Sequence, residues 1–490
     1  MLAAFASFTN RVKTSFATGY DAIKTTGKRK AAPAVLKHEE DQLRHRDRKA
    51  LIGTGRDLHR NYSTVAWAVR KHLDYVSQFE FQSRTGVAEF DEQLERLMQE
   101  WSRPFNCDAA GRHSFSRLIR MAERRRTVDG DVLLIKRANG RLQAVESDLI
   151  QNPPQMDNDQ PGSNRWFNGV KVNKDGRPLA YGLYTRSTAG QYEFQKTLRA
   201  GAAIHHAFFD RFDQVRGISP LAAAFNSFRD IYEGVDFALA KLKVEQLFAM
   251  VITDSSSDGI GTHTKTSEGY DVDFGKGPVK LELDPGDDAK FLSTDNPGHS
   301  TQDFLHLVLG MALKALDIPF SFYKEDFTNF FGSKAAFMQY ERSCRAKRDD
   351  VREMLRKITI WRMQLWIQDG ELRLPAGITL NDVPFEWVAL GMPWWDPAKE
   401  IKGDLMAIGA GLDNPYRVCK ERGRGEFEDN VKQIARAKEF AAEMGVDISF
   451  KADPVAAEPD DAGDAPDEEP DDQAEEAPEE DNEEGTDERN

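Results

Sequence analysis

The sequence DIPFSFYKEDFTNFFG occupies residues 317–332 and lies between two segments with helical spacing of apolar residues. In the preceding segment, 301–316, apolar residues fall on nearly every face, which predicts a helix buried almost all round. In the following segment, 333–369, apolar residues recur at steps of three and four, with Ser333 placed as N-cap and Gly370 as terminator. We therefore expect an aromatic loop between two helices.

Another helical pattern begins about 80 residues earlier, at residue 218. Ser219 suits the N-cap position because its hydroxyl can accept a hydrogen bond from the first turn, and Pro220 suits the first helical position. The apolar spacing continues to about residue 250, which corresponds to roughly 50 Å of helix. A helix of this length needs packing partners along its whole length.

The 333–369 pattern also carries a basic stripe, with acidic residues among its members. One interpretation is a solvated helix face held by ion pairs between neighbouring turns. The other is a basic face that meets nucleic-acid phosphates or the acidic residues of a neighbouring subunit. The stripe consists of Arg342, Arg345, Arg348, Arg352 and Arg356.

Charge is distributed very unevenly along the 490 residues, whose net charge is −15. Residues 451–490 contain 19 acidic and 2 basic residues, so the first 450 residues, with 62 acidic and 64 basic, are almost neutral. The acidic segment has no aromatic residues and few apolar ones, which predicts disorder. Its role would be solubility, repulsion of DNA, or occupation of basic sites on partner proteins. Residues 1–50 form a basic segment that we expect to be a flexible arm.

The remaining sequence predicts a mixed α and β structure. Helical patterns cover 56–82, 89–101 and 115–126, and the segments 131–137 and 141–145 flank Asn139-Gly140 as in a β-hairpin. No stretch is long enough to span a membrane. The chain lacks a P-loop or a dinucleotide-binding glycine motif, and His205-His206, adjacent on a strand, would point to opposite faces. We therefore expect no catalytic residues, no bound metal and no cofactor.

Several short motifs, taken in order, resemble the portal proteins of tailed bacteriophages, and most closely the lambda-like portal family. Their order and spacing over about 350 residues carry the resemblance more than any single motif. The motifs are Arg56-Asp57-Leu58-His59-Arg60-Asn61 followed by Val65, Ala66, Ala68 and Val69; Gly217-Ile218-Ser219-Pro220-Leu221; Asp317-Ile318-Pro319-Phe320 with Gly332-Ser333-Lys334-Ala335-Ala336; Met392-Pro393-Trp394-Trp395-Asp396-Pro397-Ala398-Lys399-Glu400; and Gly409-Ala410-Gly411-Leu412.

The resemblance implies an α+β portal-type fold with an α/β wing, a long-helix stem, a small β-containing clip, a helical crown and a disordered acidic C-terminal tail. The expected boundaries are 1–50 for the arm, 51–217 for the first part of the wing, 218–252 for the first stem helix, 253–299 for the clip, 300–317 for the second stem helix, 318–332 for the tunnel loop, 333–403 for the long tunnel helix and returning wing segment, 404–450 for the crown and 451–490 for the tail.

The resemblance also implies a structural function. The chain would form a ring, a dodecamer, at one capsid vertex of the virion, after assembly in the host cytoplasm. Double-stranded DNA would pass through the ring in packaging and ejection, independently of its sequence. The ring would nucleate procapsid assembly and bind the terminase large subunit, the major capsid and scaffold proteins, and a head-completion or adaptor protein, without contacting a membrane.

The aromatic loop would then face the DNA channel, and the arginine stripe would face the channel or a neighbouring subunit. The loop residues concerned are Phe322, Tyr323, Lys324, Phe327, Asn329, Phe330 and Phe331. Two other classes of function remain open: a nucleic-acid-processing enzyme, and a monomeric module that binds DNA or a protein partner.

Overall fold

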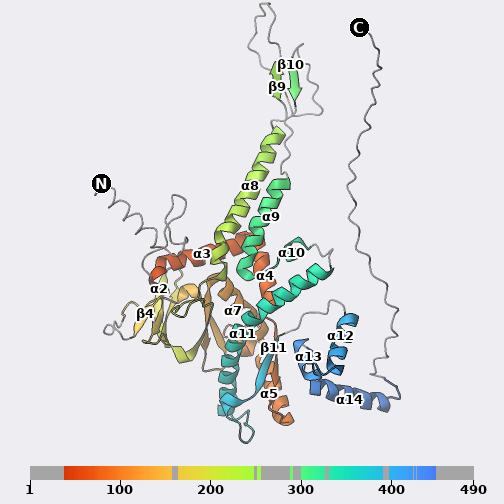
Figure 1. Cartoon of the computed structure of the whole chain (residues 1–490). Helices are drawn as coiled ribbons and strands as arrows, with labels where there is room; N and C mark the ends of the chain where they lie inside the picture. Colours follow the sequence, from red (N-terminus) through yellow and green to blue (C-terminus); the bar gives the residue numbers. More distant parts are fainter. Residues whose placement is uncertain are drawn as a thin grey trace, which may run out of the picture.

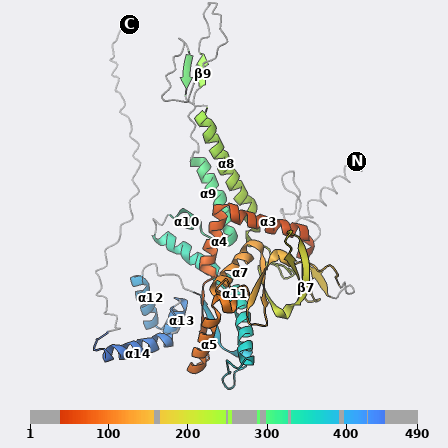
Figure 2. The ribbon, with the colours of Figure 1, turned by 180° about the vertical axis from the view of Figure 1, so that it is seen from behind.

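The computed structural model describes residues 38–156, 164–247, 251–254, 287–290, 299–325, 330–389, 397–422, 424–425 and 427–448. Figure 1 shows a body of helices and small sheets from which the antiparallel helices α8 and α9 project. The body contains α3, α4, α5, α7 and α11, whereas α12, α13 and α14 lie together beside it. Figure 2 gives the reverse view of the same arrangement. Within the described residues, no helix combines the length and apolar character needed to cross a bilayer.

The helices alternate with short strands along the chain. The α-helices are α2 Glu39–Gln42, α3 His45–Asn61, α4 Ser63–Val76, α5 Ala88–Trp101, α6 Pro104–Cys107, α7 Phe115–Asp129, α8 Phe225–Leu247, α9 His299–Leu313, α10 Phe320–Lys324, α11 Phe330–Gln368, α12 Pro397–Gly409, α13 Pro415–Glu421 and α14 Phe427–Glu443. The 3₁₀ helices are η2 Ser147–Leu149, η3 Ala200–Ala202, η4 Pro220–Ala224, η5 Lys314–Leu316 and η6 Leu380–Asp382.

The described strands form four small antiparallel sheets, with orders β3-β2-β8, β4-β5-β6-β7, β1-β11 and β9-β10. The predicted hairpin is confirmed, because β2 pairs with β3 across the turn at Gly140. The strands are β1 Phe79–Ser83, β2 Asp131–Lys136, β3 Leu142–Glu146, β4 Arg165–Phe167, β5 Val170–Val172, β6 Pro178–Arg186, β7 Tyr192–Arg199, β8 Ala203–Ala207, β9 Val251–Asp254, β10 Asp287–Lys290 and β11 Phe385–Ala389.

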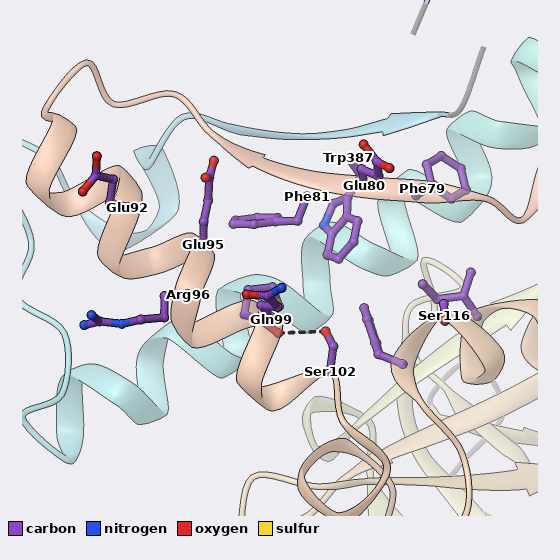
Figure 3. Close-up of a pocket in the computed structure, with 13 residues that line it drawn as sticks. Phe79, Glu80, Phe81, Glu92, Glu95, Arg96, Gln99, Ser102, Ser116 and Trp387 are labelled. Atoms are coloured by element: carbon purple, nitrogen blue, oxygen red, sulfur yellow. Dashed lines mark hydrogen bonds between the residues drawn. The ribbon is translucent and has the colours of Figure 1, made fainter. Parts of the chain in front are cut away.

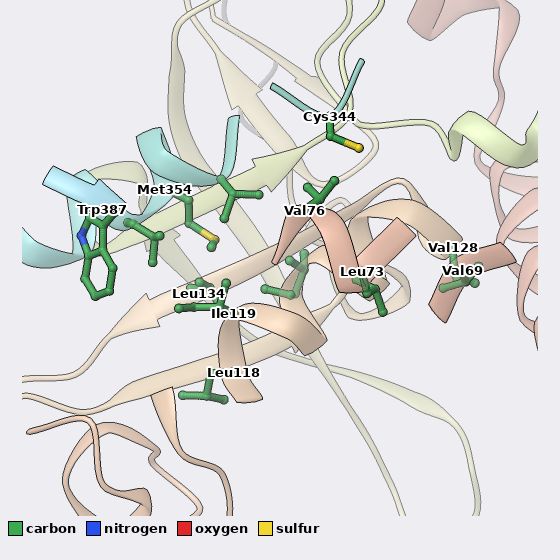
Figure 4. Packing of buried hydrophobic residues seen from close by; sticks show 14 of the residues in the cluster. Val69, Leu73, Val76, Leu118, Ile119, Val128, Leu134, Cys344, Met354 and Trp387 are labelled. Atoms are coloured by element: carbon green, nitrogen blue, oxygen red, sulfur yellow. The ribbon is translucent and has the colours of Figure 1, made fainter. Parts of the chain in front are cut away.

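One large apolar core joins segments that are far apart in the sequence. It includes Leu73 and Val76 of α4, Ile119 of α7 and Met354 of α11, which lie close together in Figure 4. Each of these side chains is nearly inaccessible to solvent. Burial of a side chain of this size contributes about 1.5–3 kcal/mol, so the core fixes the long helix α11 to the helices of the N-terminal half.

The structure explains the residues of the motif at 217–221 by their contacts with the end of α7. Gly130 ends α7 with a φ of 98°, and Gly217 passes so close to it that a side chain on Gly217 would lie 2.0 Å from the Gly130 carbonyl oxygen. Ser219 donates from its hydroxyl to the Thr127 carbonyl at 2.7 Å and accepts from the Leu221 amide at 3.1 Å. The motif thereby joins the end of α7 to the start of the η4–α8 segment.

Several predicted boundaries are wrong. The helix expected over 56–82 is two helices separated at Tyr62, whose backbone is extended and whose ring packs on Tyr232 at 4.5 Å between centroids. The helix expected from residue 218 starts with the 3₁₀ turn η4 before α8. The loop expected over 318–332 contains α10, and α11 begins at Phe330, three residues before the predicted N-cap Ser333.

Candidate functional site

The projecting helix pair α8–α9 exposes a large amount of apolar surface. On α9, Phe304, Leu307 and Met311 are each 62% exposed and share one face, because they are three and four residues apart. On α8, Tyr232, Val235 and Leu239 are 49%, 42% and 48% exposed and also share a face. We refer to these six residues as the stem apolar face. The prediction that 301–316 is buried nearly all round is wrong for the isolated chain.

The two projecting helices pack against each other through their other sides. Gly234 of α8 lies close to Leu305 of α9: a Cβ placed on this glycine would be 3.1 Å from a Leu305 methyl group. Leu309, Ala312 and Leu313 of α9 are buried in the main core. The stem apolar face is therefore surplus to what this chain needs for its own packing.

The structure separates the residues that were expected to form one loop. Phe322 is buried in α10, with its ring 4.6 Å from that of Phe337 and 5.4 Å from that of Tyr340. Tyr323 is 41% exposed and meets Trp67 edge-on, whereas the exposed Lys324 lies with Nζ 5.7 Å from the centre of the Phe320 ring. Expecting Phe322 to face a channel is therefore wrong for this chain.

The structure describes less of the other loop residues. Phe327 and Asn329 lie outside the described residues. Phe330 and Phe331 form the first turn of α11, for which only the backbone is described. Asp317 adopts a left-handed conformation with φ of 59°, and its carboxylate accepts from Ser343 at 2.7 Å and pairs with Lys347 at 2.9 Å. These contacts attach the start of the 317–332 segment to α11.

The arginine stripe of α11 divides into buried and exposed members. Arg348 is buried: its Nε donates to the Tyr75 carbonyl at 2.7 Å and its guanidinium pairs with Glu341. Arg352 pairs with Asp349 at 2.6 Å and donates to the Trp387 carbonyl at 3.2 Å. The remaining three are exposed, although Arg356 also donates to the Asn381 carbonyl at 3.4 Å. Arg348 is therefore buried within the chain, whereas Arg342, Arg345 and Arg356 are exposed; that the exposed members face a channel or a neighbouring subunit stays a prediction.

A buried ionic network fixes the sheet β3-β2-β8 to the rest of the body. Asp131, at the start of β2, accepts from Arg216 at 2.6 and 3.0 Å and from Arg48 at 3.1 Å, and His205 lies 3.1 Å away. Burial alone would raise the pKa of Asp131, but Arg216 and Arg48 hold it well below its usual range. Sequence reasoning could not find this pair, because Arg216 lies 85 residues from Asp131 along the chain.

A second buried cluster lies on the opposite face of β8. Glu123 of α7 lies 2.9 Å from His72 and 2.8 Å from His206, and Arg126 donates to it at 3.0 Å. Arg126 also pairs with Asp350 of α11. His205 and His206 therefore point to opposite faces of the strand, as predicted, and each has a carboxylate partner. The two networks explain the buried charges as structural contacts between α4, α7, β8 and α11.

An open groove of about 630 Å³ lies between β1, α5 and α7. Figure 3 shows Phe81 and Trp387 on one side of it and Glu92 and Glu95 on α5. Burial raises the pKa of Glu95 above its ordinary value. The lining contains no histidine or cysteine, and its serines have no adjacent base, so it lacks the nucleophile–base pair of an acyl-transfer site.

Metal and thiol chemistry find little support in the described part of the chain. No three His, Cys, Asp or Glu side chains there are grouped so as to hold a metal ion. Burial raises the pKa of Cys107 to about 12 and that of Cys344 to about 11, so both thiols are protonated and unreactive near neutral pH.

Comparisons with known proteins give a consistent result. A family model described as "Phage portal protein, lambda family" matches residues 26–348. A protein named "Probable portal protein" from Halomonas phage phiHAP-1 is 23% identical over 442 residues, which cover 84% of this chain and 83% of that protein.

Among solved structures, a chain from the virion of a native gene transfer agent particle is similar with a TM-score of 0.47 and 14% identity over 77% of this chain and 93% of that one. A chain from the neck of the empty particle, computed with C6 symmetry, gives a TM-score of 0.48 at the same identity and coverage. The family model alone spans well over half of the sequence, and with it the motifs at 56–61, 217–221 and 317–320. The chain belongs to the lambda family of phage portal proteins.

Proposed function

We propose that this chain forms a closed ring at a capsid vertex, a dodecamer, through which double-stranded DNA enters and leaves the particle. The role is structural rather than catalytic. In this proposal, residues 51–217 with the returning part of 333–403 form the wing, 218–252 and 300–317 the stem, 253–299 the clip and 404–450 the crown. Most of 255–298 and all of 451–490 lie outside the described residues.

The observation that carries the proposal, beside the family, is the stem apolar face. Six large apolar side chains on two projecting helices are far more exposed than an isolated chain favours, and contiguous exposed apolar surface marks an interaction site. A head-to-tail contact that repeats with a fixed rotation closes into a ring. Packing of each α8–α9 pair against its neighbour would cover this face in every subunit.

The charge distribution supports passage of DNA rather than its capture. The first 450 residues are nearly neutral, and α11 mixes acidic residues with its exposed arginines. Each phosphate that a protein neutralises adds binding free energy, so a strongly basic wall would hold the duplex in place. We propose that the loop residues near the channel are Tyr323, Lys324, Phe327, Asn329, Phe330 and Phe331. Arg342 and Arg345 would meet the channel or a neighbouring subunit.

The proposed partners follow from this location: the terminase large subunit and head-completion protein at the two ends of the ring, and major capsid and scaffold proteins around it. The ring would nucleate procapsid assembly and would be made in the host cytoplasm before it becomes part of the virion. No described site supports an enzyme that processes nucleic acid.

Placing a charge on the stem apolar face tests the ring. We expect Leu307→Asp to convert the assembled particle into single chains of 55.3 kDa, because every interface in the ring would bury an unpaired carboxylate at a cost of several kcal/mol. Light scattering after size-exclusion chromatography measures the mass.

Gln302→Asp is the matched control, because it places the same charge at an exposed position of α9 outside the stem apolar face and should leave the assembly unchanged. Assembly of Leu307→Asp chains with the yield and mass of the unsubstituted protein would contradict a ring held by this face.

A further inference from the structure

An arginine cluster lies on α4 and α7. Arg117, Arg120 and Arg124 lie three and four residues apart on one face of α7, with Arg125 beside them and Arg70 facing them from α4. The two helices are joined through His72 and Glu123 on their inner sides; Arg70 and Arg117 are exposed, and the other three arginines are half-buried. The arginine cluster consists of these five residues.

The described carboxylates neutralise only part of this charge. Arg120 pairs with Asp74 at 2.6 Å, and Arg125 lies 3.7 Å from Asp129, which is already bound to Arg56. Among the described residues, the Nε atom of Arg124 is buried without a hydrogen-bond partner. The cluster therefore holds a net charge of about +3, and like charges at this spacing destabilise a folded chain.

The proximity of the arginines is also evident from their effect on neighbouring groups. Burial lowers the pKa of Arg124, and the charges of Arg120, Arg125, Arg117 and Arg70 lower it further. Burial likewise lowers the pKa of His59, and Arg125, Arg124 and Arg70 add to the shift. A polyanion would relieve this repulsion.

We propose that the arginine cluster binds the acidic segment 451–490 of this same protein, from its own subunit or from an adjacent one. The segment carries 19 carboxylates in 40 residues, and guanidinium groups bind carboxylates through two parallel hydrogen bonds. From its composition we expect the segment to be disordered, and a disordered chain of 40 residues would span roughly 35 Å, or more under charge repulsion. Tethering supplies an effective concentration in the millimolar range, about that of a short flexible linker.

Duplex DNA is the competing anion, and the segment fits better. Five arginines close together would neutralise several phosphates and hold a duplex with a steep dependence on salt, which opposes movement of DNA past the protein. The acidic segment is instead present once per chain, so cluster and ligand occur in equal numbers. Bound in this way, it would compete with other anions for the cluster.

Photo-crosslinking within the full chain tests the proposal directly. Benzoylphenylalanine in place of Met121, which lies among Arg117, Arg124 and Arg125 on the helix, should crosslink to peptides from 451–490. We expect the yield to fall at least fivefold in Arg70→Gln/Arg117→Gln, two exposed sites, and fivefold again when NaCl rises from about 0.15 to about 1 M, where the Debye length falls to about 3 Å.

Two controls make the result specific. Arg177→Gln/Arg199→Gln removes the same charge from exposed positions on the wing and should leave the yield unchanged, and benzoylphenylalanine at Thr197 of β7 should give no crosslink to the segment. The salt dependence of the crosslinking yield is also measured without the arginine substitutions, so this result does not depend on whether the double variants fold. Absence of the crosslink, equal yields in the two double variants, or crosslinking of Met121 to added duplex DNA with none to the segment would overturn the proposal. Ring formation is measured separately and does not enter this test.

Discussion

Arg216 shows how much of this fold depends on single buried side chains. Its guanidinium binds both carboxylate oxygens of Asp131 and donates to the carbonyl of Ile150 at 3.0 Å and to that of Asn168. Only 1% of the residue is exposed. A planar fork with five donors can satisfy these acceptors simultaneously, whereas an ammonium group cannot.

Replacing this fork with a lysine should therefore be severe. We expect Arg216→Lys to lower the free energy of unfolding by about 3–5 kcal/mol, the range for breaking a buried ion pair, with Asp131 left partly unpaired. Urea unfolding followed by circular dichroism measures the change. The same substitution at the exposed Arg177 should shift stability by less than about 0.5 kcal/mol. Equal stabilities of the two variants would show that the Asp131 network is not needed.

The buried histidines predict how stability depends on pH. Burial lowers the pKa of His72 and of His205 below the ordinary 6.5, in spite of their carboxylate partners. Below about pH 6.5 the unfolded chain therefore binds protons that the folded chain does not, so stability is complete above that pH and falls as pH decreases, until the folded-state pKa values are passed.

Removing one of these histidines should flatten that dependence. We expect His72→Gln to reduce the slope of unfolding free energy against pH between about 5 and 6.5 by up to about 1.4 kcal/mol per pH unit, the largest contribution of a single group. Urea unfolding at several pH values gives the slope. A slope identical to that of the unsubstituted chain would mean that His72 is protonated equally in both states.

At the scale of elements, the long helix α11 combines two kinds of arginine. Arg348 is buried against Tyr75 and Glu341, so we expect Arg348→Ala to cost about 3 kcal/mol or more by leaving Glu341 and a carbonyl without their partner. Arg345 is exposed, and Arg345→Ala should change stability by less than about 0.5 kcal/mol. Thermal unfolding measures both. Equal effects of the two substitutions would indicate that all arginines of the stripe lie on one solvated face of α11.

Sequence periodicity predicted those elements whose signals are local. The N-cap Ser219, the hairpin around Gly140 and the helices α5 and α7 follow from nearby residues, and the structure has them. The break at Tyr62 and the burial of Arg348 could not be predicted, because both depend on partners from distant segments, Tyr232 and Tyr75. The exposed face of α9 was missed for another reason: an apolar pattern shows that a surface is covered, but not whether its own chain covers it.

At the scale of the whole molecule, the described chain is a body with its own core and a projecting helix pair without enough neighbours. The core accounts for the stability of the body, since α4, α7 and α11 bury their apolar faces together. Phe304, Leu307 and Met311 each remain 62% exposed beside the described residues. The projecting helix pair therefore carries apolar surface that a single chain leaves exposed. We expect several copies of the chain to meet on this surface.

Negative-stain electron microscopy of the purified full-length protein is the most direct test of this account. We predict ring-shaped particles with a central hole, whose class averages show a repeated subunit, and their loss in Leu307→Asp but not in Gln302→Asp. Only compact particles without a hole, in every buffer and also after co-expression with capsid shell components, would contradict it.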